Sequence, residues 1–285
     1  MSDDSINRKG RAARSLTSLG KHIFLIFGIL LVLSPLYFTV ITSFKSKQNY
    51  SADKFGFPSP FYTGNIETAL RGGRYFTWFK NSAILAVGSV LLSTAVSAMA
   101  AFAFARMRFR FRNPMLSIVT ALMIVPPVVM LVPLFLLLST LHMTSTYWGA
   151  ILVYAGLVTP FSVYLLTNFF KSIPFEIIES ALLDGANSWN ILLKILLPLS
   201  GPALVTMIVV NTLWVWNDLL VALVLLPQDD LRPLMVGIAV FGSRYNNDVP
   251  VAMMGMLMAS IPMLLLYLFG QRYFIQGLVA GAVKG

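Results

Sequence analysis

The sequence contains no cysteine, only two histidines and few charged residues. Without cysteine, the chain can form neither a disulfide nor a thiolate metal site. Charged residues make up 11% of the 285 residues, whereas a soluble domain has about 25%. This shortage of charge argues against a soluble enzyme, a disordered tail and a secreted disulfide scaffold.

Hydrophobic residues are abundant instead, at 57% of the chain, and the mean hydropathy is +0.78. A helix needs about 20 apolar residues to cross a bilayer, and a length of this order recurs along the chain. Six such stretches occur, at 23–43, 82–105, 115–138, 146–168, 203–226 and 252–270. Because backbone groups in lipid must be hydrogen-bonded within the segment, we predict an all-α polytopic membrane protein with six transmembrane helices.

The chain divides into a short polar segment and a long membrane domain. Residues 1–22 are polar and basic. The apolar stretch at 23–43 is too long for the core of a signal peptide and lacks a clear cleavage site, so we interpret it as a retained first span. We predict that residues 23–285 form one six-helix domain, with the polar loop 169–202 on the cytoplasmic side.

The net charge of +10 indicates which loops face the cytoplasm. Four arginines, Arg106, Arg108, Arg110 and Arg112, share one short loop, where positive residues most strongly indicate the inner side. The first outer loop, near 44–81, is also basic, so the bias is modest. We predict a protein of the cell (plasma or inner) membrane with both termini in the cytoplasm. The arginines and the basic N-terminal segment would contact anionic lipid, and we do not expect nucleic-acid binding.

Prolines interrupt several of the predicted spans. Each one removes a helical hydrogen bond and kinks the helix. They could mark hinges or a cavity, or they could reflect ordinary packing in a helix bundle, where proline is common. The residues concerned are Pro35, Pro126, Pro127, Pro133, Pro160 and Pro262.

The loop between the fourth and fifth spans has the pattern of two short helices joined by a turn. Ser172 can cap the first helix, and Pro174 suits its first turn. Gly185 is placed to end that helix in the left-handed conformation. Asn187 or Ser188 can cap the second helix. Such an element could simply rest on lipid, or it could dock a cytoplasmic partner.

The spacing within this loop resembles the EAA loop of ABC-importer permeases. The family pattern is E-A-A, three residues, G, nine residues and I-x-L-P. Ser180 stands where the second position is usually alanine, and it is also small. The matching positions are Glu179, Ala181, Gly185, Ile195, Leu197 and Pro198, and Asp184-Gly185-Ala186 is also similar to the family's common D-G-A.

Two further segments narrow the resemblance to carbohydrate importers. Trp216-Asn217-Asp218, followed by Leu219, is similar to an element of carbohydrate-importer permeases. The C-terminal segment 274–285 resembles the ending of the maltose-type second permease subunit. The resemblance therefore implies a sugar or oligosaccharide as the substrate. An importer of another solute, such as glycerol phosphate, and a non-transporting scaffold or receptor are the alternatives.

The resemblance also implies a mechanism and a set of partners. The loop would form a coupling helix that docks on a separate ATPase, so that ATP binding drives alternating access in the membrane. The partners would be a second homologous permease, two ATPase subunits that bind ATP and Mg, and an extracytoplasmic solute-binding protein. This chain has no G-x-x-x-x-G-K-[ST] phosphate loop. His22 and His142 are far apart, so we expect no catalysis, cofactor or metal in this chain.

Polar residues in the fifth span are candidates for the substrate path. Asn211, Trp214 and Asp218 fall on one helical face, and Asn217 is adjacent. Amides and carboxylates can hydrogen-bond sugar hydroxyls, and indole rings can stack on sugar C–H faces. The alternative is that these side chains bond to neighbouring helices. The outer loop near 227–251 would contact the solute-binding protein, or it is merely a solvated connector.

Overall fold

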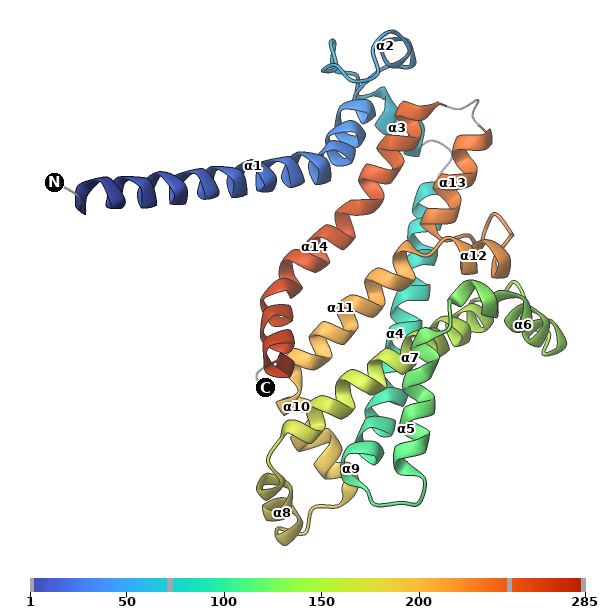
Figure 1. The fold of residues 1–285 in the computed structure, drawn as a ribbon. Helices are drawn as coiled ribbons and strands as arrows, with labels where there is room; N and C mark the ends of the chain where they lie inside the picture. The colour runs from blue at the N-terminus through green and yellow to red at the C-terminus, as the bar shows by residue number, and fades with distance from the viewer. Residues whose placement is uncertain (1–2, 71–73, 245–247, 283–285) are drawn as a thin grey trace. The chain divides into compact units, whose positions relative to one another are not determined.

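The computed structural model describes residues 3–70, 74–244 and 248–282, with side chains described in 20–70, 74–240 and 248–271. The described residues form helices, turns and loops without any strand, which confirms the all-α prediction (Figure 1). Side chains of the first 19 residues and of the C-terminal motif at 274–285 lie outside the described residues. The chain forms two compact units, Met1–Ala69 with Tyr245–Leu257, and Leu70–Arg244 with Met258–Gly285.

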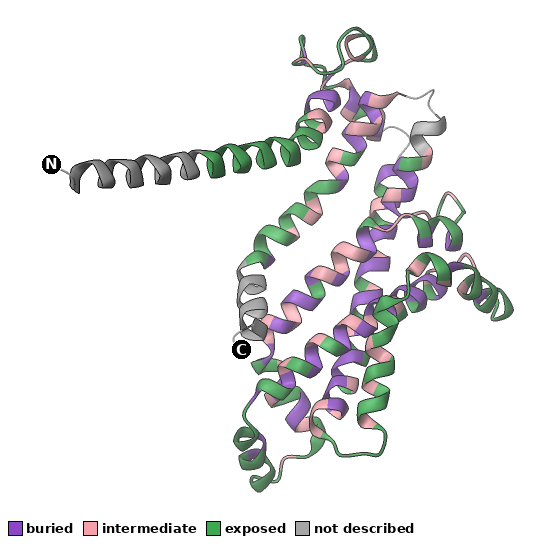
Figure 2. Ribbon diagram, viewed as in Figure 1, coloured by how far each residue is buried: buried purple, intermediate pink, exposed green. Residues whose placement is uncertain are grey.

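The first unit is built around α1 (Asp3–Ser43). Its part Gly20–Ser43 is long and apolar enough to cross a membrane, and none of its most apolar window is buried within the chain. In Figure 2 most of the ribbon of this stretch is coloured as exposed. Two short helices follow, α2 (Lys47–Ala52) and α3 (Gly64–Leu70).

The second unit has α4 (Arg74–Arg106) and α7 (Tyr147–Ser172) as its most extensively packed pair. The two helices run parallel, because residues near both starts contact each other and so do residues near both ends. Buried serines on α4 permit this close approach, as small residues do between membrane helices. The Thr159 hydroxyl of α7 lies 3.1 Å from that of Ser93 on α4.

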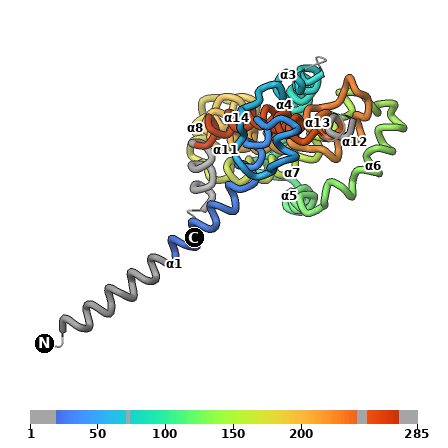
Figure 3. Tube along the Cα trace, turned by 90° about the horizontal axis from the view of Figure 1, so that it is seen from above, coloured from blue at the N-terminus to red at the C-terminus, as the bar shows by residue number. Residues whose placement is uncertain are grey.

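The third predicted span, 115–138, is bent rather than straight. It consists of α5 (Arg112–Ala121), the 3-10 turn η1 (Leu122–Ile124) and α6 (Pro127–Thr140), with an angle of 105° between its halves. The bend lies at the adjacent prolines, which favour an extended conformation in the residue before each of them. Figure 3 shows α6 at the edge of this unit, beside α12.

The fifth predicted span, 203–226, is also interrupted. The helix α11 (Gly201–Asn217) makes an angle of 79° with the helical segment before it. It ends before Asp218, whose backbone is extended, and the short α12 (Leu220–Leu225) begins after the break. The expectation of one continuous helix was therefore wrong at this point.

The remaining helices are α13 (Leu234–Arg244) and α14 (Val249–Ala282). Among the described residues, four helices are long and apolar enough to cross a membrane, and each of the two bent pairs can form one further span. The protein is therefore a multi-pass membrane protein, with up to six spans.

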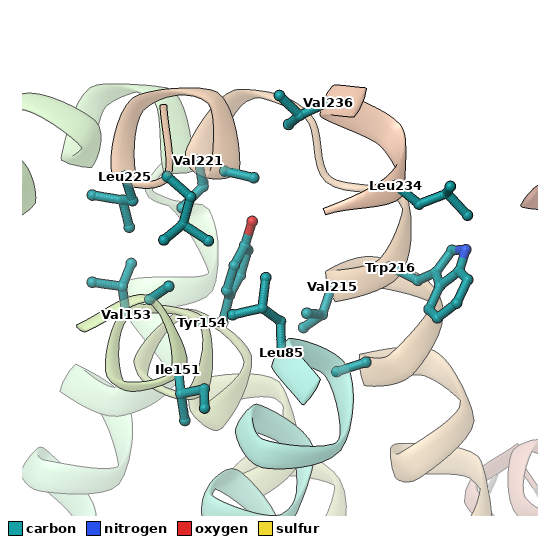
Figure 4. Close-up of a cluster of buried hydrophobic side chains, with 14 of the residues drawn as sticks. Leu85, Ile151, Val153, Tyr154, Val215, Trp216, Val221, Leu225, Leu234 and Val236 are labelled. Carbon is teal, nitrogen blue, oxygen red and sulfur yellow. The ribbon is translucent and has the colours of Figure 1, made fainter. Parts of the chain in front are cut away.

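A buried hydrophobic cluster joins α4, α7, α11, α12 and α13 in the second unit. Figure 4 shows Tyr154 near its centre, with the hydroxyl directed toward α12. Trp78 of α4 packs directly on the backbone of Gly237 in α13. These contacts fix the broken end of the fifth span against α4 and α7.

Candidate functional site

The EAA-like loop begins with α8 (Phe175–Leu183) and turns at Gly185. Gly185 has φ of +80°, which confirms the left-handed turn predicted from the sequence. Its amide donates to Leu182 O at 3.0 Å, and the amide of Ala186 donates to Ala181 O at 2.9 Å. This pair of bonds is the Schellman ending of a helix, which favours glycine because any Cβ is strained in that conformation.

The caps of the two helices differ in part from expectation. Ser172 does not cap α8, because it is the last residue of α7 and its hydroxyl donates to Phe169 O at 2.7 Å. Pro174 is itself the N-cap residue of α8, without a side-chain hydrogen bond. Asn187 caps the next helix by accepting a hydrogen bond from the amide of Asn190 at 2.9 Å, which confirms one of the two residues considered.

One edge of α8 is fixed and the other is open. Ile178 and Ala181 are buried in a second hydrophobic cluster with the end of α7. Glu179 and Ser180 are exposed, and Leu183 is 85% exposed. We call the exposed apolar side chains of this loop its open edge: Phe175, Ile177, Leu182, Leu183 and Trp189.

The second half of the loop holds it on the membrane helices. It consists of α9 (Ser188–Asn190), the π-helical segment η2 (Ile191–Leu196) and α10 (Leu197–Leu199). The buried side chains of η2 belong to the same cluster as Ile178. In the motif, Ile195 and Leu197 are half-buried against this cluster, and Pro198 is exposed.

Residues 72–280 match the family described as binding-protein-dependent transport system inner membrane component. The chain belongs to this family. It is a permease subunit of a binding-protein-dependent importer, as the EAA-like spacing indicated.

Named relatives agree with the carbohydrate-uptake resemblance. The arabinooligosaccharides transport system permease protein AraQ of Halalkalibacterium halodurans is 35% identical over 213 residues, covering 75% of this chain and 76% of AraQ. The melibiose/raffinose/stachyose import permease protein MelC of Bacillus subtilis is 32% identical over 252 residues, covering 88% and 91%. A chain in the crystal structure of a bacterial alginate importer has a TM-score of 0.81 at 24% identity, covering 92% and 98%, which shows the same fold.

Asn211 and Trp214 of the permease border one cavity of about 560 Å³. Its lining is almost entirely apolar and comes from η1, α6, α7 and α11. Asn211 is buried, and its amide donates to the Ser162 hydroxyl at 2.8 Å. Trp214 is half-buried and meets the ring of Tyr154 edge to face at 6.2 Å.

Asp218 and Asn217 point elsewhere. The Asp218 carboxylate accepts hydrogen bonds from the Tyr154 hydroxyl at 2.8 Å and from the Ala222 amide at 3.1 Å. It therefore joins α7 to α12 across the break. Asn217 is exposed and donates to Leu213 O of its own helix at 2.8 Å. Asp218 does not share the predicted helical face with Asn211 and Trp214, because α11 ends at Asn217.

Arg106 links two helix ends beside the EAA-like loop. Its guanidinium donates to Phe170 O and to Ile173 O, the latter at 2.5 Å. Both carbonyls lie at the end of α7, where helices lack internal partners and favour cations. The sequence grouped Arg106 with the lipid-binding arginines, but its guanidinium already bonds to protein. Lipid contact stays a prediction for the exposed Arg108 and Arg110.

Replacing Arg106 with Met should impair transport, because the ends of α4 and α7 would lose their polar link. Leaving buried carbonyls unpaired costs about 1–3 kcal/mol. We expect more ATP hydrolysed per solute transported in liposomes that contain the complete importer. Arg106→Lys should recover part of the coupling. Arg108→Met is the matched control, and an equal effect in both Met variants would argue against this link.

The loop near 227–251, which we predict to face outward, is fixed in its first part. The buried amide of Asn81 donates to Asp230 O at 2.8 Å and to Arg232 O at 2.9 Å, and its oxygen accepts from the Tyr147 hydroxyl at 2.7 Å. Asp229 pairs with Arg74 at 2.9 Å and also with Arg232. This part is therefore not merely a solvated connector. Residues 245–247 of the same loop lie outside the described residues.

The sequence did not single out Asn81, Tyr154 or Ser162. Tyr154 and Ser162 lie within the predicted span 146–168, Asn81 lies just before the span 82–105, and each partner lies dozens of positions away. A search for polar residues that recur on the inward faces of two spans would have flagged them as a group, without assigning the pairs.

Proposed function

We propose that this permease imports a sugar or oligosaccharide and that its EAA-like loop couples transport to a separate ATPase. The observation that carries the coupling proposal is the asymmetry of α8. Ile178 and Ala181 anchor the helix in a buried cluster, whereas Leu182 and the 85% exposed Leu183 of the open edge are left uncovered. An exposed apolar patch on a rigid element is typical of a protein interface.

This arrangement can transmit movement to the membrane helices. A force on the open edge of α8 acts directly on the cluster that holds the ends of α4, α7 and the start of α11. Because packed helices move as bodies rather than deforming continuously, the displacement would tilt these helices and change access to the substrate path. Glu179, Ser180 and Asp184 are exposed beside the open edge and would contact the ATPase cleft.

In this proposal, separate ATPase subunits bind and hydrolyse ATP. The chain lacks a phosphate-loop sequence, so two ATPase subunits would bind ATP and Mg. A second homologous permease would complete the pathway, and an extracytoplasmic solute-binding protein would deliver the solute. Residues 1–22, the loop 169–202 and the C-terminus would face the cytoplasm.

The sugar proposal is supported by the names of AraQ and MelC and by the similarity around Trp216-Asn217-Asp218. The test is to reconstitute the permease with its partner permease, ATPase and binding protein in liposomes. We expect oligosaccharides to stimulate ATP hydrolysis, whereas glycerol phosphate does not. If only glycerol phosphate stimulates ATP hydrolysis, the sugar proposal is wrong and the alternative solute is supported.

Trp214 and Asp218 should respond differently to substitution. Trp214 borders the cavity, so Trp214→Ala should raise the solute concentration for half-maximal uptake by about tenfold, equivalent to about 1.4 kcal/mol. The Asp218 carboxylate already accepts hydrogen bonds from Tyr154 and Ala222. Asp218→Asn should therefore mainly lower the amount of assembled importer. Uptake kinetics and quantitative immunoblotting would separate the two effects. An unchanged uptake affinity in Trp214→Ala would remove that residue from the substrate path.

A further inference from the structure

A loop that follows the first span is held firmly in place. We call residues 53–61 the aromatic loop. The Lys45 ammonium donates to Asp53 O at 2.7 Å, and the Asn49 amide donates to Ser59 O at 3.1 Å. The Tyr37 hydroxyl of α1 donates to Phe55 O at 3.3 Å. The aromatic loop is thereby tied to the end of α1 and to α2, within the first unit.

The turn inside the loop is also built by specific bonds. The Asp53 carboxylate accepts from the amides of Phe55 at 3.0 Å and Gly56 at 2.9 Å. The bond from Gly56, followed by that from Phe55, lowers the pKa of Asp53, so this carboxylate stays ionised at neutral pH. Lys45 is only 1% exposed, although burying an ammonium group is costly unless it is hydrogen-bonded. Several polar hydrogen bonds therefore hold this turn in one conformation.

The fixed turn presents its aromatic rings outward. Phe55, Phe57 and Phe61 are 72%, 75% and 60% exposed. They are not scattered, because Phe57 and Phe61 border a hollow of about 350 Å³ that is also lined by Leu33, Leu36 and Val40 of α1. The rings thus continue the exposed apolar face of the first membrane span. Lys54, which is exposed, places a positive charge beside them.

We propose that the aromatic loop is a lipid-binding element, in which Phe55, Phe57 and Phe61 insert into the bilayer at the boundary between headgroups and acyl chains. The contact with α1 identifies lipid as the occupant, because Phe57 and Phe61 line one hollow with Leu33, Leu36 and Val40 of the apolar stretch Gly20–Ser43, which is long enough to cross the bilayer. Aromatic rings are enriched at this depth in membrane proteins. By resisting movement into or out of the membrane, the loop would hold the end of α1 at a fixed depth.

The absence of native cysteine makes the test direct. Three single-cysteine variants, Phe57→Cys, Leu33→Cys and Gln48→Cys, would be labelled with an environment-sensitive fluorophore. The complete importer would be reconstituted in vesicles of phosphatidylethanolamine and phosphatidylglycerol. Leu33 lies within the span and Gln48 is exposed on α2, so these labels report lipid and water respectively.

We expect the label at position 57 to be blue-shifted and quenched by nitroxide lipids, as at position 33, and to be protected from aqueous iodide. Quenching by iodide to the extent seen at position 48 would overturn the proposal. Protection from both quenchers would also overturn it, and would place the second permease on the rings. Iodide access that appears only when the solute-binding protein is omitted would overturn it in favour of that protein.

Discussion

Gly185→Arg should leave the permease in the membrane and abolish solute-stimulated ATP hydrolysis and uptake. Gly185 has φ of +80°, where a residue with a Cβ is strained by about 1–2 kcal/mol. No atom of a non-adjacent residue lies within 4 Å of the position that a Cβ would take, so the Cβ itself meets no steric obstacle. The effect should therefore come from a displaced α8 and from a bulky cation beside the open edge.

The decisive measurement compares uptake and ATPase activity of the variant importer in liposomes. Gly185→Asn is the matched control, because asparagine tolerates the left-handed conformation and should keep most of the coupling. Full solute-stimulated transport by Gly185→Arg would contradict the proposed role of the loop. If Gly185→Arg impairs coupling but Arg106→Met does not, only the proposed role of Arg106 in coupling is refuted.

Gly237→Ala should reduce the stability of the folded permease substantially. The added methyl group would overlap with the indole of Trp78, which is itself buried. Overpacking of a core costs about 1–3 kcal/mol, and here it would outweigh the gain of about 1 kcal/mol from replacing glycine in a helix. We expect a lower midpoint of thermal unfolding in detergent and less monodisperse protein.

Gly156 of α7 provides the control for this comparison. It also lies within a helix, but no atom lies within 4 Å of its ideal Cβ position. Gly156→Ala should therefore keep or slightly raise the unfolding midpoint. Equal midpoints for the two alanine variants would show that the indole of Trp78 can move aside for the methyl group at little cost.

The membrane architecture could be predicted because it depends on local properties. Hydrophobic length predicted six spans, of which four are single long helices among the described residues and two correspond to bent pairs. The glycine position predicted the turn at Gly185. The adjacent prolines, Pro126 and Pro127, indicated a kink, but their sequence could not give an angle of 105°. The angle depends on what packs against both halves, and this information is distributed over the other helices.

The candidate site was less predictable, because its polar contacts join distant positions. Asp218 was placed on a helical face, since a run of apolar residues continues to position 226. Its bonds to Tyr154 and Ala222 instead stabilise a break in the helix. An acid that ends one helix and accepts a hydrogen bond from the next has the same local sequence as an acid within a helix, so periodicity alone could not distinguish them.

The parallel pair of α4 and α7 is tied at both ends, through Asn81 and Tyr147 at the start and through Arg106 and Ile173 at the finish. Such a pair cannot splay at one end while staying closed at the other. In the proposed coupling, a push at the end near α8 would therefore move both helices as one rigid body. Under that proposal, one rotation of the pair would open the substrate path on one side of the membrane and close it on the other.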